Sequence, residues 1–224
     1  MTDIEVFVGT LGALGPDGTP SGIFKHRISL PIELGPNGLA GDIQADRKAH
    51  GGPEKALCHF PAQHYGRLAA QFPALRNALA PGSLGENLSC SGWDETTVHI
   101  GDVFALGTCR LQVSQPRSPC WKIDHKLGVA DVARHIAEQA LMGWYYRVLE
   151  GGTITPEARL ELIARNADPV SLARLWQAHR AHRPRAEELR AIAQTPGLAP
   201  IWRKKLLERQ SWLEKLLGRG GGGG

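Results

Sequence analysis

The stretch of sequence that decides the fold lies at residues 97–114 and reads TVHIGDVFALGTCRLQVS. It holds three short apolar runs, at 97–100, 103–106 and 110–114, which are separated by Gly-Asp and by Gly-Thr-Cys. Apolar and β-branched runs bounded by glycine are typical of strands, and connections of two or three residues are typical of hairpins. The stretch therefore predicts a meander of neighbouring strands.

The same pattern extends over the first two thirds of the chain. It predicts further strands at residues 4–8, 22–30, 56–60, 143–149 and 159–164, and another strand that opens after Gly85. Two helices are expected, one at 62–71 between two prolines and one at 129–142. Because strands and helices do not alternate regularly, a barrel or sandwich is favoured over a doubly wound sheet. We therefore predict a mainly β domain with α additions over residues 1–165.

The last third of the chain has a different pattern. Apolar residues recur at helical spacing around Leu172, Leu189 and Trp202, with proline or glycine between the groups. This predicts a small three-helix domain at 166–217, followed by a flexible glycine-rich tail at 218–224. Residues 156–224 carry a net charge of +6, against −2 for residues 1–155. Acidic residues are scattered among these arginines, so we interpret the basic face as solvated and do not expect nucleic-acid binding.

The composition excludes several classes of protein. With 224 residues, 42% of them hydrophobic and 21% charged, the chain resembles folded globular proteins. Its apolar stretches are too short to span a bilayer, and the N-terminus lacks the basic and apolar segments of a secretory signal. We expect a cytoplasmic protein without membrane contact. Its four cysteines include no Cys-x-x-Cys pair, which argues against zinc and iron–sulfur motifs and predicts free thiols.

The strongest candidate for chemistry is Cys120, which ends the segment QPRSPC at residues 115–120. Two prolines stiffen this loop, and the cations Arg117 and Lys122 favour the thiolate form of the cysteine. Such a thiolate can act as a nucleophile, as a persulfide carrier or as a ligand of a soft metal. The alternative is a buried structural cysteine on a proline-rich turn.

A second candidate lies at residues 47–55, where His50, Gly51 and Gly52 precede Lys55. Glycines let backbone N–H groups approach an anion, and a lysine beside them adds a positive charge. A simple tight turn is the alternative. Asn87, in the run at 85–88, would either hydrogen-bond a heterocycle or cap a turn.

Five motifs, taken in order, resemble the MOSC-domain family in its bacterial YiiM type. They are GLAGDIQAD at 38–46, HGGPEKA at 50–56, GENL at 85–88, QPRSPC at 115–120 and GWYYRVL at 143–149. The resemblance covers residues 1–165, and the segment at 166–217 is similar to the three-helix domain that follows in that subgroup. It implies a β-barrel-like MOSC fold.

The resemblance also implies a cofactor site. The pterin-based molybdenum cofactor, molybdopterin, would be bound with Cys120 as the molybdenum ligand and catalytic residue. The residues expected to contact the cofactor are His50, Gly51, Gly52, Lys55, Asn87, Gln115, Arg117 and Ser118. Its phosphate requires cations and backbone donors, and its metal requires a soft ligand. Cys58, Cys90 and Cys109 have no counterpart in the family motif and are expected to be structural. No pyridoxal phosphate site is expected.

The implied activity is reduction of small N-hydroxylated compounds, including base analogues such as hydroxylaminopurine. Because the chain carries no flavin, haem or cysteine-cluster motif, we expect a separate reductase to donate the electrons. The alternative is sulfur carriage on a Cys120 persulfide, in molybdenum-cofactor or metal–sulfur metabolism.

Overall fold

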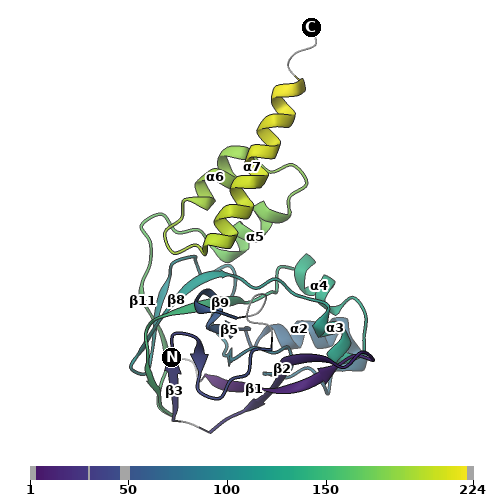
Figure 1. Cartoon of the computed structure of the whole chain (residues 1–224), viewed down its shortest axis with the longest axis vertical. Coiled ribbons are helices and arrows are strands. Elements are labelled where there is room, and N and C mark those ends of the chain that lie inside the picture. Colours follow the sequence, from purple (N-terminus) through teal and green to yellow (C-terminus); the bar gives the residue numbers. More distant parts are fainter. Residues whose placement is uncertain (1–3, 30, 46–50, 221–224) are drawn as a thin grey trace.

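Two sheets form the β part of the computed structural model, which describes residues 4–29, 31–45 and 51–220. Figure 1 shows this part below a group of helices. The larger sheet has eight strands in the order β11-β7-β8-β9-β5-β6-β1-β2, and the smaller has the order β10-β3-β4. Only β5 and β6 pair in parallel within the described residues. The strands are β1 (Glu5–Leu14), β2 (Thr19–Arg27), β3 (Ile32–Gly35), β4 (Gly38–Leu39), β5 (Leu57–His59), β6 (Leu88–Ser89), β7 (Val103–Leu106), β8 (Cys109–Pro116), β9 (Trp144–Glu150), β10 (Gly152–Ile154) and β11 (Leu160–Ala164).

The prediction of a mainly β domain with α additions is confirmed, and so is the β7–β8 hairpin. The larger sheet is not a closed barrel, because its edge strands β11 and β2 do not pair with each other in the described chain. The strand predicted at 97–100 is wrong. Its backbone instead pairs with the segment that leads to the last helices: Ile100 N–H donates to Val170 O, and Val98 O accepts from Leu172 N–H.

Three helices flank the sheet: α2 (His64–Gln71), α3 (Lys122–Leu127) and α4 (Val132–Glu138). α2 confirms the helix predicted at 62–71, although it begins two residues later. The helix predicted at 129–142 is shorter, because Asp131 and Ala140 adopt left-handed φ values of 68° and 54° at its two ends. The sequence analysis missed α3, which ends at Gly128 with a φ of 67°. Short 3-10 turns, η1 (Pro53–Lys55) and η2 (Pro73–Leu75), complete these elements.

The C-terminal helices are α5 (Leu172–Arg180), α6 (Ala186–Ala193) and α7 (Pro200–Gly220), three in number as predicted, although α7 continues to Gly220 beyond the predicted boundary at 217. They stand on one end of the β part, and α7 rises away from it (Figure 1). Buried residues of these helices, among them Leu172 and Trp176, belong to the same apolar cluster as Ile100 and Leu111 of the β part. Trp176 also donates its indole N–H to Ala137 O over 2.8 Å. The helices are therefore docked onto the β part and share its core.

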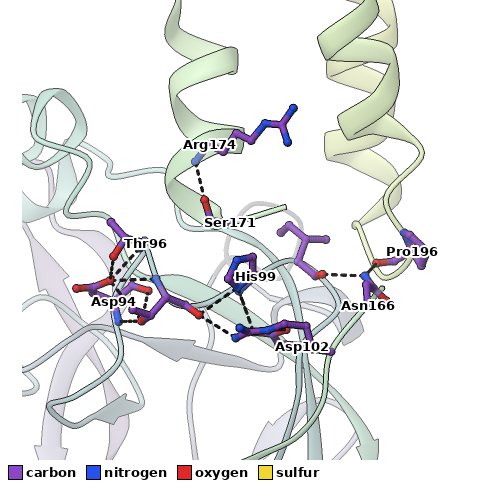
Figure 2. A network of polar contacts seen from close by, with 11 residues as sticks. Asp94, Thr96, His99, Asp102, Asn166, Ser171, Arg174 and Pro196 are labelled. Atoms are coloured by element: carbon purple, nitrogen blue, oxygen red, sulfur yellow. Dashed lines mark hydrogen bonds and ion pairs between the residues drawn. The ribbon is translucent and has the colours of Figure 1, made fainter. Parts of the chain in front are cut away.

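A polar network reinforces this junction (Figure 2). Asp102 is fully buried and accepts two hydrogen bonds from the Arg165 guanidinium, at 2.9 and 2.7 Å, and one from His99 N–H. Asn166 Nδ2 donates to Ile100 O and Pro196 O, both over 3.0 Å. Ser171 caps α5 by accepting from Arg174 N–H. The chain is thus pinned where it leaves the β part.

None of the described helices combines the length and apolarity that a membrane span requires.

Candidate functional site

A cavity on the β part gathers most of the charged groups predicted for the site. It has about 660 Å³ of empty space, including the part open to solvent. Five of the predicted residues line it: Lys55, Asn87, Arg117, Ser118 and Cys120. Further lining residues come from β2, the 42–45 loop, β5, α3 and β9, and the ionisable ones among them are Lys25, Asp42, Cys58, Lys122 and Tyr145.

The cysteine loop connects β8 to α3. Arg117 N–H donates to Gly143 O over 3.0 Å, and its guanidinium donates to Leu84 O, so both ends of this residue are tied to neighbouring segments. Cys120 is partly exposed, whereas Cys58, Cys90 and Cys109 are buried. The loop therefore presents one accessible thiol at the cavity wall.

The positive charge of Arg117 is secured by its surroundings. Burial by itself would lower the pKa of the guanidinium, but its interactions with Cys58, Tyr145, Glu86 and Cys120 together raise that pKa above its ordinary value. Burial raises the pKa of the Cys58 thiol and that of the Tyr145 hydroxyl, with Arg117 acting in the opposite direction on both. The cavity wall thus carries a permanent cation at Arg117.

A buried ion pair forms another part of the wall. Lys25 Nζ lies 2.5 Å from Asp42 Oδ1, and the two side chains are 5% and 2% exposed. Asp42 Oδ1 also accepts from Gly9 N–H, and its Oδ2 accepts from Asn87 Nδ2 over 3.0 Å. Asn87 is fixed in turn, since it donates to Phe7 O and accepts from Cys58 N–H.

Two glycines make this arrangement possible. A Cβ on Gly22 would lie 1.9 Å from Ile43 O, and one on Gly9 would lie 2.5 Å from Gly22 O. Because no side chain intervenes, the 42–45 loop packs directly on β1 and β2, and Ile43 N–H donates to Gly9 O. The glycines thereby place Asp42 beside Lys25.

The other predicted site residues have different outcomes. His50 lies outside the described residues, and Gly51 and Gly52 are not among the described residues that line the cavity. Gln115 is buried and is not among the described residues that line the cavity, and its Oε1 has no hydrogen-bond partner in the described structure, so its contact with a cofactor stays a prediction. The pairing of β8 with β9 shifts register between Val113 and Gln115, and such an irregularity redirects side chains.

Asn87 reaches the cavity, but both N–H groups of its amide are used by Phe7 O and Asp42. Its observed role is to position Asp42, and direct contact with a cofactor stays a prediction. The sequence analysis missed Lys25, Asp42 and Tyr145 as site residues and treated Cys58 as structural. Asp42 and Tyr145 lie within motifs that it quoted, which was the available signal; Lys25 lies in none of them.

A separate buried cluster surrounds His59, which stacks on Trp144 with ring centroids 4.3 Å apart. Burial is the main cause that lowers the pKa of His59 to about 3, and the nearby His64 acts in the same direction. His64 Nε2 lies 2.7 Å from Glu95 Oε2, and Glu95 also accepts from Gly143 N–H. Among the described residues, no group of three or more His, Cys, Asp or Glu side chains is placed to hold a metal ion. A metal at the cavity would therefore need ligands beyond those that the described side chains supply.

Comparisons with known proteins give a consistent family assignment. The MOSC-domain profile matches residues 46–161. The chain is 35% identical to Protein YiiM of Escherichia coli over 92% of each chain. The crystal structure of YiiM from Escherichia coli superposes with a TM-score of 0.80 and 28% identity, covering 94% of this chain and 92% of that one. A protein of Gibberella moniliformis named "Reductase" is 30% identical over 83% of this chain and 33% of its own length.

Proposed function

Because the chain belongs to the MOSC-domain family, we propose that it binds a pterin-based molybdenum cofactor in the cavity and reduces small N-hydroxylated compounds. The observation that carries this proposal is the meeting of one accessible thiol, Cys120, with several cations in one cavity. A relative named as a reductase supports the class of reaction.

The residues present fit such a group. The described lining includes four basic side chains, Lys25, Lys55, Arg117 and Lys122, and one acidic side chain, Asp42. This excess of positive charge suits a phosphate-bearing ligand, since charge-assisted hydrogen bonds to phosphate are strong. A thiolate is the protein ligand that suits a soft metal centre, and the pterin dithiolene would supply the further ligands that the described side chains do not.

The chain's own residues would divide the work. Cys120 would ligate the metal, while Lys55 and Arg117 would hold the anionic end of the cofactor. Lys55 Nζ lies 5.8 Å from the centre of the Tyr145 ring, which places it on the same wall as Arg117. When bound, the cofactor would supply the two electrons that cleave an N–O bond; the protein binds and orients the reactants.

The 224-residue sequence carries no flavin, haem or cysteine-cluster motif that would supply the electrons. We expect a separate reductase to deliver electrons to this protein.

A second function deserves a test because Cys58 lines the same cavity as Cys120. A persulfide on Cys120 could pass its outer sulfur to an acceptor without a resident metal. Burial raises the pKa of the Cys58 thiol, which disfavours the thiolate that would attack such a persulfide. This observation favours the metal-binding proposal.

Metal and pterin analysis of freshly purified protein separates the two functions. Protein from a cofactor-producing host should contain molybdenum and pterin, and Cys120→Ala should lose most of the metal. Cys109→Ala is the matched control, since Cys109 is buried and does not line the cavity. Protein without molybdenum but with a sulfur atom on Cys120 that is labile to reductant would contradict the proposal and support sulfur carriage.

A further inference from the structure

Lys25 occupies an unusual position on the cavity wall. Its side chain is 5% exposed, lines the same cavity as Cys120, and is held by Asp42 over 2.5 Å. Asp42 is itself fixed by donors from Gly9 and Asn87. The ammonium is therefore tethered through three segments of the chain rather than extended into solvent.

The hydrogen bonds of Lys25 leave donors for a ligand. An ammonium group carries three N–H bonds, and the described residues provide one acceptor, Asp42 Oδ1. A Cβ on Gly9 would come within 3.1 Å of Nζ, so the bare backbone of β1 closes one side of the group. Its remaining N–H groups are available to a molecule in the cavity.

We infer that Lys25 is a catalytic residue that gives a proton to the substrate nitrogen as the N–O bond breaks. This inference rests on the proposed function. As R–NH–OH is reduced, the electron pair of the N–O bond stays with nitrogen, which takes a proton from Lys25 Nζ and leaves as R–NH₂. The oxygen receives two electrons from the reduced cofactor and leaves as water with a proton from solvent, and solvent also reprotonates Lys25.

Two other cations of the wall, Arg117 and Lys55, are less suited to this task. A guanidinium does not release its proton near neutral pH, and the surroundings of Arg117 raise its pKa further. Lys55 is placed against the Tyr145 ring and is assigned to the cofactor's anionic end. The carboxylate partner of Lys25 is itself buried and fixed, so its ammonium has the preorganised position that proton transfer requires.

The test uses the cofactor-loaded full chain, 6-hydroxylaminopurine as substrate and a chemically reduced dye as electron donor. Lys25→Ala should lower kcat by about 10²- to 10⁴-fold, the range for loss of a general acid. The variant should still bind pterin, because Lys55, Arg117 and Lys122 remain on the cavity wall, and kcat is expressed per bound pterin. Methylammonium added to the variant should restore kcat at least partly, whereas tetramethylammonium, which has a charge but no proton to give, should not.

Two further variants keep the result decisive. Lys25→Arg retains the positive charge but should remain slow, since arginine does not give up its proton. If the unpaired Asp42 prevents Lys25→Ala from folding, Lys25→Ala/Asp42→Asn removes the buried charge and takes its place in the rescue experiment.

The outcomes distinguish this inference from the function on which it rests. Wild-type protein that carries the cofactor but does not reduce the substrate overturns the proposed function and the role of Lys25 together. If the wild type is active, three results would overturn the role of Lys25 alone. These are a Lys25→Ala variant that retains its kcat, one that loses its pterin, and one whose kcat is restored equally by both ammonium ions.

Discussion

Replacing Arg165 by alanine should weaken the place where the chain leaves β11 toward the C-terminal helices. The guanidinium donates twice to Asp102 and once to Thr97 O, and Asp102 is fully buried. In Arg165→Ala the carboxylate would keep, among its described partners, the hydrogen bond from His99 N–H and a longer contact with His99 Nδ1 at 3.7 Å. A buried charge would then lack its counter-charge.

The expected magnitude follows from this burial. Removing one partner of a buried ion pair costs about 3–5 kcal/mol. The Arg165 side chain is 33% exposed, so water can reach part of the vacated space, and we expect about 2–4 kcal/mol. For a chain of this size each kcal/mol lowers Tm by about 2–4 °C, which gives a fall of roughly 4–16 °C.

Thermal and urea unfolding would measure the loss, with Arg110→Ala as the matched control. Arg110 pairs with Glu150 over 3.1 Å, but these side chains are 55% and 60% exposed, so the control should lose about 0–1 kcal/mol. Adding Asp102→Asn to Arg165→Ala should recover part of the stability, because it removes the unpaired charge. Equal losses in the two single variants would refute the reasoning.

Three other predictions concern the cavity wall, the core and the helices. Gly22→Ala should lower the free energy of unfolding by about 1–3 kcal/mol and lower the pterin content, because its Cβ would meet Ile43 O. Gly35→Ala is the control: no atom lies within 4 Å of its Cβ, so it should be near neutral in the same unfolding and pterin assays. The pKa of His59 is lowered to about 3 in the folded state, so the unfolded state binds a proton first as the pH falls. The free energy of unfolding should therefore fall by up to about 1.4 kcal/mol per pH unit between about pH 6.5 and 3. Urea unfolding of wild type and His59→Phe at several pH values would show whether this slope belongs to His59. Truncation after Ala164 should lower the urea midpoint by exposing core residues, yet keep pterin bound, since the described cavity lining includes no residue beyond 164; a folded but pterin-free truncation would contradict this.

The parts of the site that sequence could predict are those with a local cause. Two prolines and neighbouring cations mark Cys120 and Arg117 within a few residues of each other, and the structure places both on the cavity wall. The ion pair of Lys25 and Asp42 has no such local mark, because it joins residues 17 positions apart through the approach of a loop to β2. That approach depends on the absence of a side chain at Gly22, which a lone glycine in a strand-like run does not reveal.

The failed fold predictions have a related cause. Residues 97–100 have the composition of a strand, but their backbone partners lie some 70 residues later, at Val170 and Leu172. Periodicity reports which side chains are buried and does not report which segment supplies the hydrogen bonds. The register shift in β8 has the same character, since it changes the pairing between Val113 and Gln115 without leaving a signal in the apolar pattern.

The helical segment and the cavity meet at one buried strand residue, Ser114. Its carbonyl accepts from Ala199 N–H at the start of α7, while its hydroxyl donates toward Glu54 O and Tyr145 O. Glu54 adjoins Lys55, Tyr145 lines the cavity, and β8 continues from Ser114 into the cysteine loop. The helices therefore brace the strand that leads into the Cys120 loop through a backbone contact, without placing any described side chain in the cavity. The C-terminal helices thus affect how rigidly the site is held, whereas the described residues that line the site all lie between positions 21 and 145.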